Sequence, residues 1–213
     1  MNARYEDFGK FLEMWFALHL DNPKVDPYRI KANLDVIYSS AGRYYHNATH
    51  INDGLVELDS VRDLTAKPEE VEVAWYFHDV VYDSKAKDNE EKSAELARKV
   101  LADSGVNLER ISRVGNLVLA TKHLIVPTKR DAQVLVDIDL SILGKSGEVF
   151  DEYESNIRKE YSWVPEDQFR AGRKAVLRAF SKRPILYSTE FFRDKYEDKA
   201  RENLARSINQ LSG

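Results

Sequence analysis

The segment AWYFHDVVYD, residues 74–83, places a histidine and an aspartate directly after an apolar and aromatic run. Upstream, Pro68 and the two glutamates that follow it predict the start of a helix, because acidic side chains suit its positive end. This helix should deliver His78 and Asp79 near its C-terminal end. Burying an aspartate there is costly unless something compensates it. We therefore expect both side chains to lean toward one metal ion in the groove between them.

A second polar interruption lies in VLVDIDLSILG, residues 134–144, where Asp137 and Asp139 break another apolar helix. Residues two positions apart on a helix point about 200° away from each other. At most one of the two carboxylates should therefore face the site of the doublet. The other should cap a helix, pair with a cation or meet solvent.

The third interruption is RYYHNATHI, residues 43–51. We expect a loop that contains His46 and ends where Thr49 caps a helix. His50 then falls in the first turn of this helix, which must also pack Ile51 inward. Three separate helices would thus each present a group that can bind a metal.

Helical spacing of apolar residues recurs along the chain, whereas strand-like alternation beside hairpin turns is hard to find. The first apolar stripe consists of Phe8, Phe11, Leu12, Trp15 and Leu18. His19, at the end of that helix, is interpreted as a packed or solvent-facing side chain. No repeat, low-complexity stretch or long Gly/Ser linker marks a boundary. We predict an all-α fold, with about ten helices in one compact bundle over residues 1–213 and a metal-site core at about 43–145.

Composition narrows the function classes. The chain has 32 Lys and Arg against 36 Asp and Glu, which gives a formal charge of −4. This charge does not indicate a basic surface that would bind duplex nucleic acid. It has no cysteine, which excludes disulfides, thiolate metal sites and a cysteine nucleophile. With neither a leader pattern nor an apolar run of membrane-spanning length, we expect a cytoplasmic protein with no membrane partner. The sequence does not indicate an oligomeric state.

Together these residues resemble the HD-domain superfamily of metal-dependent phosphohydrolases, which carry a histidine, a later His-Asp doublet and a distant aspartate on separate helices. The resemblance implies His50, His78, Asp79 and Asp139 as metal ligands. Asp139 is preferred to Asp137 because the last ligand of the family usually precedes an apolar turn that contains leucine.

The chain is also similar to a small stand-alone group of predicted bacterial HD phosphohydrolases. The similarity rests on RYYHNATHI, FHDVVYDSKAKDNEEKSA, DIDLSILG and IRKEYSWVP, which spread over residues 43–165. It implies hydrolysis, by metal-activated water, of a phosphoester in a small phosphorylated compound, with a nucleotide as the first candidate. The ligands suit a divalent ion such as Mn, Fe, Co, Ni, Zn or Mg, among which the sequence does not choose.

Further site roles follow from residues that flank the ligands. Asp83 and His46 are the candidate catalytic acid or base groups. His46 and His123 could instead contact phosphate, orient a ligand or bind a second metal, and His123 equally suits the negative end of a helix. The candidate substrate-binding residues are Arg43, His123, Arg158 and Lys159.

Two other interpretations stay open. In the related stringent-response nucleotide hydrolases an acidic pair follows the doublet, whereas this chain has Tyr82 and Asp83 there. That departure allows a catalytically inactive nucleotide-binding or regulatory module that keeps the fold. A helical scaffold whose histidines and aspartates only satisfy one another as buried pairs is the third possibility.

Overall fold

The computed structural model describes residues 3–18 and 25–212, and within them it is built from helices without any β-strand. The side chain of Phe8 and all of His19 lie outside the described part. The α-helices are α1 (Ala3–Leu18), α2 (Pro27–Tyr38), α3 (Ala48–Val61), α4 (Pro68–Phe77), α5 (Asn89–Ser104), α6 (Leu108–Ala120), α7 (Arg130–Leu140), α8 (Gly147–Glu160), α9 (Glu166–Ser181) and α10 (Glu190–Gln210). Two short 3₁₀ helices, η1 (Arg62–Leu64) and η2 (Ser141–Gly144), follow α3 and α7. The predicted all-α bundle is confirmed.

Helix α4 is the centre of the fold, and it contacts α1, α3, α5, α6 and α7. Its residues from Glu70 to Phe77 are all buried, and its two buried glutamates are paired with arginines. A helix that is buried all round belongs in the core of a protein. Because α4 ends at Phe77, His78 and Asp79 emerge inside the molecule instead of at its surface.

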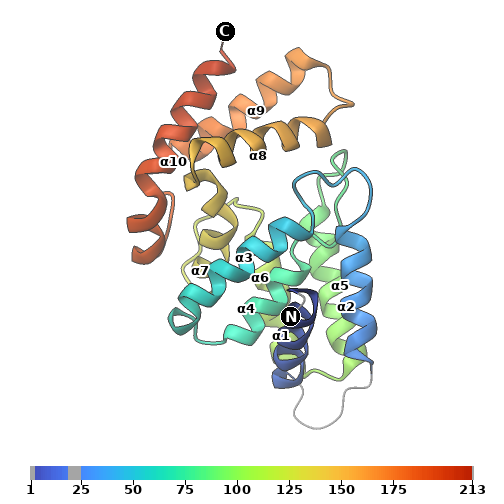
Figure 1. The fold of residues 1–213 in the computed structure, drawn as a ribbon. Coiled ribbons are helices and arrows are strands. Elements are labelled where there is room, and N and C mark those ends of the chain that lie inside the picture. Colours follow the sequence, from blue (N-terminus) through green and yellow to red (C-terminus); the bar gives the residue numbers. More distant parts are fainter. Residues whose placement is uncertain (1–2, 19–24, 213) are drawn as a thin grey trace.

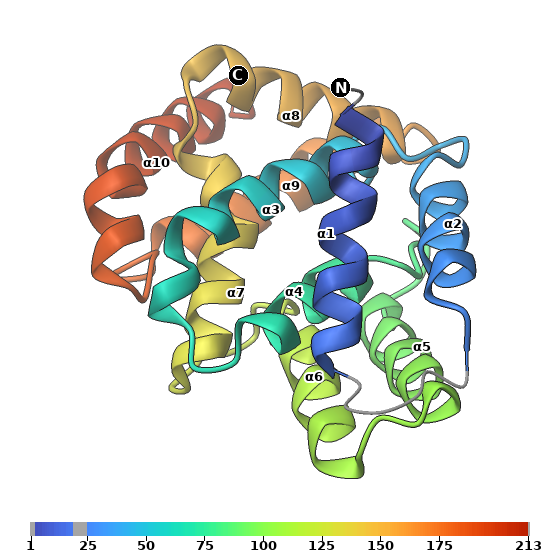
Figure 2. The same cartoon turned by 60° about the horizontal axis from the view of Figure 1, so that its bottom comes forward.

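The C-terminal helices form a separate group on the core. Figures 1 and 2 show α8, α9 and α10 together at one end of the molecule, with α3 and α7 between them and α5 and α6. Helix α10 packs on α9 and on η2, where the Asn203 amide donates to the carbonyls of Leu143 and Lys145. No helix in the described ranges is both long enough and apolar enough to cross a membrane.

Helix ends mostly follow the local sequence signals. The Asp26 carboxylate caps α2, the Ser146 hydroxyl caps α8, and Gly105 ends α5 with a φ of 91°. The predicted cap of α3 was wrong. Asn47, not Thr49, accepts from the first amides of that helix, at Thr49 and His50. The cap therefore lies two residues earlier and fixes the backbone of His50 directly.

Close packing at Gly54 carries a testable consequence. A Cβ atom at this position would lie 1.9 Å from Cζ2 of the Trp75 indole, which cannot move away because it stacks on His78 and donates to the Ile51 carbonyl. We expect Gly54→Ala to lower the free energy of unfolding by about 2 kcal/mol, despite the better helix propensity of alanine. Urea denaturation measures this change.

The matched control is Gly172→Ala in α9, where an added Cβ meets nothing within 4 Å. It should raise the free energy of unfolding by up to about 1 kcal/mol. Equal stability of the Gly54→Ala variant and the wild type would contradict the packing described here.

Candidate metal centre

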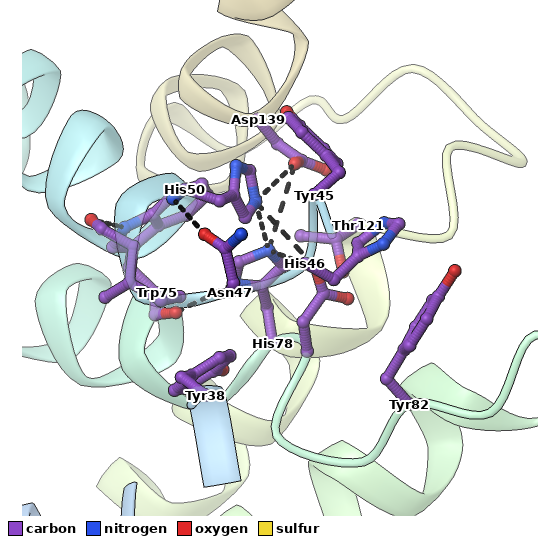
Figure 3. Close-up of polar contacts among 12 residues, drawn as sticks. Tyr38, Tyr45, His46, Asn47, His50, Trp75, His78, Tyr82, Thr121 and Asp139 are labelled. Atoms are coloured by element: carbon purple, nitrogen blue, oxygen red, sulfur yellow. Dashed lines mark hydrogen bonds and ion pairs between the residues drawn. The ribbon is translucent and has the colours of Figure 1, made fainter. Parts of the chain in front are cut away.

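Three elements bring His50, His78 and Asp139 together, from the first turn of α3, the end of α4 and the last turn of α7. One ligand atom from each lies within 4.8 Å of the others. The Nε2 atoms of the two histidines are 3.1 Å apart. Oδ1 of Asp139 lies 3.6 Å from Nε2 of His50 and 3.8 Å from Nε2 of His78. Figure 3 shows these side chains converging. The cluster could hold a metal ion.

Asp79 contacts the same two imidazoles. Its Oδ2 atom lies 3.0 Å from Nε2 of His78 and 3.8 Å from Nε2 of His50. The side chains of Asp79 and Asp139 are 15% and 16% exposed, whereas those of His50 and His78 are only 6% and 1% exposed. The imidazoles therefore form the floor of the cluster, and the carboxylates form its more accessible side.

Packing and hydrogen bonding orient both imidazoles. Nδ1 of His78 lies 2.7 Å from the Trp75 carbonyl, which only accepts, so Nδ1 carries a proton and Nε2 is the ring nitrogen that faces the cluster. The His78 ring also stacks on the Trp75 indole, with centroids 4.3 Å apart. The His50 ring lies against Trp75 on one side and Tyr45 on the other. Metal-binding histidines are commonly held through their other nitrogen in this way.

The electrostatics of the cluster favour a positive charge. Burial lowers the pKa of His78, but Asp79 and Asp139 outweigh it and raise that pKa to about 9. Burial and the neighbouring His78 lower the pKa of His50 to about 4. Burial raises the pKa values of Asp79 and Asp139, but the nearby histidines hold both below the usual value. The pocket thus stabilises ionised carboxylates next to neutral or protonated imidazoles.

The donor set fits a divalent cation. Ligand atoms that share one ion at about 2.0–2.2 Å lie about 3.0–3.4 Å from each other. The separations of 3.0 and 3.1 Å that involve His78 meet this requirement, and those of 3.6–3.8 Å need only small side-chain movements. Imidazole and carboxylate ligands without thiolate suit several first-row divalent ions. The identity of the metal does not follow from the cluster.

Asp137, unlike Asp139, bonds to backbone amides and not to the cluster. Its side chain is fully buried, and its two oxygens accept from the backbone amides of Ser188 and Thr189, which lead into α10. Burial raises the pKa of this carboxyl to about 6, although the two amides oppose the rise. The two aspartates thus separate as their spacing predicts, with Asp139 in the cluster and Asp137 at the start of α10.

We expect Asp137→Ala to lower the free energy of unfolding by about 3 kcal/mol, because the buried amide of Thr189 and the partly buried amide of Ser188 lose their acceptor. Metal binding should survive, since this carboxylate does not contact the cluster. Asp139→Asn should do the opposite and impair metal binding without a comparable loss of stability. Urea denaturation and calorimetric metal titration of both variants distinguish the two roles, and loss of metal binding by Asp137→Ala alone would contradict the assignment.

His123 contacts the cluster through Asp139. Its Nε2 atom lies 2.7 Å from Oδ2 of Asp139, the carboxylate oxygen opposite the one that faces His50 and His78. The backbone of His123 adopts a φ of 56°, and Arg183 donates to its carbonyl. This histidine therefore orients a candidate ligand, which is one of the roles open for it from the sequence.

His46 lies beside the cluster with a partner that the sequence did not reveal. Its Nδ1 atom is 2.6 Å from Oε2 of Glu160, a buried residue at the end of α8. Tyr82 donates to the same oxygen, at 2.7 Å, and stacks on the His46 ring. Glu160 lies in the IRKEYSWVP segment, where the sequence predicted site roles for Arg158 and Lys159 but none for Glu160.

Arg43 links two segments of the site through backbone hydrogen bonds. Its guanidinium donates to the carbonyls of His46, Asp79 and Val80, and thereby ties the loop before α3 to the doublet. It also lies over the rings of Tyr38 and Tyr82. This arrangement gives Arg43 a structural role in positioning Asp79, whatever contact it makes with a substrate.

The structure does not bring the remaining predicted residues into the cluster. Asp83 is exposed, and its carboxylate accepts from the Lys85 amide in the loop before α5. Arg158 donates to Glu166 and to the carbonyls of the turn between α8 and α9. The exposed Lys159 contacts Asn156. All three charged side chains are thus engaged by contacts within a turn or at a helix end.

Comparisons with known proteins add no assignment. No protein-family model matches this chain, and searches of curated proteins and of solved structures find no significant match. The interpretation of the candidate metal centre therefore rests on its own residues and their geometry.

Proposed function

We propose that this protein is a metal-dependent phosphohydrolase that cleaves a phosphoester of a small phosphorylated compound, with a nucleotide as the first candidate. The observation that carries the proposal is the convergence of His50, His78 and Asp139 on one point, with Asp79 beside them. A divalent ion held there would acidify a water molecule and polarise a phosphoryl oxygen. The sequence resemblance to the HD superfamily supports the same assignment.

The residues of the chain divide the remaining work. His50, His78 and Asp139, with Asp79, would hold the ion, while the Trp75 carbonyl and His123 orient two of these ligands. The His46 ring lies 6.2 Å from that of His50, so it is the group best placed to exchange a proton with a substrate, whereas Asp83 is exposed and accepts from the Lys85 amide. The two partly exposed carboxylates mark the side from which a phosphoester would approach.

Binding of a nucleotide without turnover is the second candidate. It is favoured by Tyr82, whose hydroxyl donates to Glu160, and by Asp83, which is exposed and accepts from the Lys85 amide. Neither Tyr82 nor Asp83 thus supplies a carboxylate to the cluster. Under this alternative the protein binds metal and nucleotide but releases no product.

Elemental analysis of the purified protein, followed by a phosphatase, phosphodiesterase and nucleotide panel with each divalent ion added back, tests the proposal. We expect a bound metal and metal-dependent release of product from at least one substrate class. Metal and nucleotide binding without product across the panel would establish the second candidate. Absence of metal binding would refute both and leave a helical scaffold with buried His–Asp pairs.

A further inference from the structure

Glu160 is a buried carboxylate with four donors. Its side chain is fully buried at the end of α8. Oε1 accepts from the backbone amides of Tyr45 and His46, at 2.7 and 3.0 Å. Oε2 accepts from the Tyr82 hydroxyl and faces Nδ1 of His46, at 2.7 and 2.6 Å. A single carboxylate thus holds the loop before α3 and both members of a stacked His–Tyr pair.

These contacts decide which nitrogen of His46 carries a proton. Burial raises the pKa of Glu160, but His46 and the other donors outweigh it and bring it to about 2. The carboxylate is therefore ionised and can only accept. Nδ1 of His46 must donate to it, so Nε2 is the ring nitrogen left for other partners.

Aromatic contacts prevent the ring from turning. The His46 ring stacks on Tyr82 with centroids 4.1 Å apart, and it meets the edge of Tyr45 at 5.0 Å. Its centroid lies 6.2 Å from that of His50, so the ring borders the metal centre.

We propose that Glu160, aided by Tyr82, is a positioning residue that fixes His46 in its Nδ1–H form and leaves Nε2 available to a substrate at the metal centre. The inference rests on the proposed function for its catalytic consequence. In phosphoester hydrolysis an oxygen from water adds to phosphorus, the bond from phosphorus to the leaving oxygen breaks, and one water proton passes to that oxygen. Nε2 of His46 is the atom to which we assign this proton transfer.

Glu160→Gln is the sharpest test, because it changes one atom. The glutamine carbonyl can keep the two backbone amides that now bond to Oε1. Its NH₂ group then faces Nδ1 of His46, which must become an acceptor, so the proton moves to Nε2. Two-dimensional ¹⁵N–¹H spectra of histidine-labelled, Zn²⁺-loaded protein report the tautomer directly, and a His46→Gln sample assigns the signal.

We expect the Nδ1–H form in the wild type and the Nε2–H form in Glu160→Gln. The matched control is Glu154→Gln on the same helix, where the carboxylate bonds to Arg173 and Ser207 instead of the site. It should keep the wild-type tautomer. The spectra are recorded at a pH where the His46 ring is neutral. An Nε2–H signal in the neutral wild type, or an unchanged signal in Glu160→Gln, overturns the inference whether or not the protein is a hydrolase.

Kinetics test the catalytic consequence once a substrate is known. Loss of a positioned acid–base group costs about 10²-fold or more in rate, so kcat of Glu160→Gln should fall by about that factor with KM and metal content unchanged. Glu160→Asp, which keeps a carboxylate, should restore part of the loss, and Glu154→Gln should keep the wild-type kcat. An unchanged kcat in a folded Glu160→Gln variant would overturn the role of Glu160, whereas a wild type without activity would overturn the proposed function instead.

Discussion

Replacing His78 and Asp79 together by alanine should abolish specific binding of divalent metal. The double substitution removes the His78 imidazole, whose Nε2 lies 3.1 Å from that of His50. It also removes the Asp79 carboxylate, which lies 3.0 Å from Nε2 of His78. Loss of even one residue that only supports a ligand weakens metal binding about 10–100-fold, so we expect a rise in Kd of more than about 100-fold. Isothermal titration and elemental analysis after dialysis measure it.

The control for this experiment is Asp83→Ala. This substitution also removes an acidic residue close to the doublet, but that carboxylate is exposed and accepts from the Lys85 amide. Metal affinity should stay within a few-fold of the wild type. Metal binding that survives in the double variant would place the ion elsewhere in the molecule.

Metal should also stabilise the folded protein, because its ligands come from α3, the end of α4 and α7, and meet only after folding. A ligand at 100 times its Kd stabilises the native state by about 2.7 kcal/mol. For a protein of this size that corresponds to a rise in Tm of roughly 5–10 °C. Thermal melts with and without the preferred ion, and after chelation, measure the shift.

The specificity of this effect is checked with the variant that lacks His78 and Asp79, whose Tm should not respond to the metal. A similar rise in that variant would indicate binding at exposed carboxylates instead. An unchanged wild-type Tm at saturating metal would contradict the proposed centre.

The ligand candidates could be found from the sequence because each breaks an apolar helix. His78 and Asp79 follow the buried α4, and Asp139 lies in the buried α7, so a polar side chain there needs a partner. Helical geometry also predicts that Asp137 and Asp139 diverge, as they do. Local signals failed at the start of α3, where Asn47 and Thr49 are both good caps and only the path of the loop chooses between them.

Other parts of the site depend on contacts between distant segments. Glu160 reaches His46 from 114 residues away, and no pattern around either residue encodes that pairing. Arg43 shows the same limit, since a basic residue beside a phosphate-site motif suggests a phosphate contact, whereas its guanidinium bonds to backbone carbonyls. Charged side chains near a motif are thus easily assigned to a ligand when folding has already given them protein partners.

The most direct test of the metal centre is an anomalous difference map from a crystal of the Zn²⁺-loaded protein. We predict one strong peak at about 2.0–2.2 Å from Nε2 of His50, Nε2 of His78 and a carboxylate oxygen of Asp139. No peak at this position, with the imidazoles and carboxylates bonded only to one another, would contradict the account.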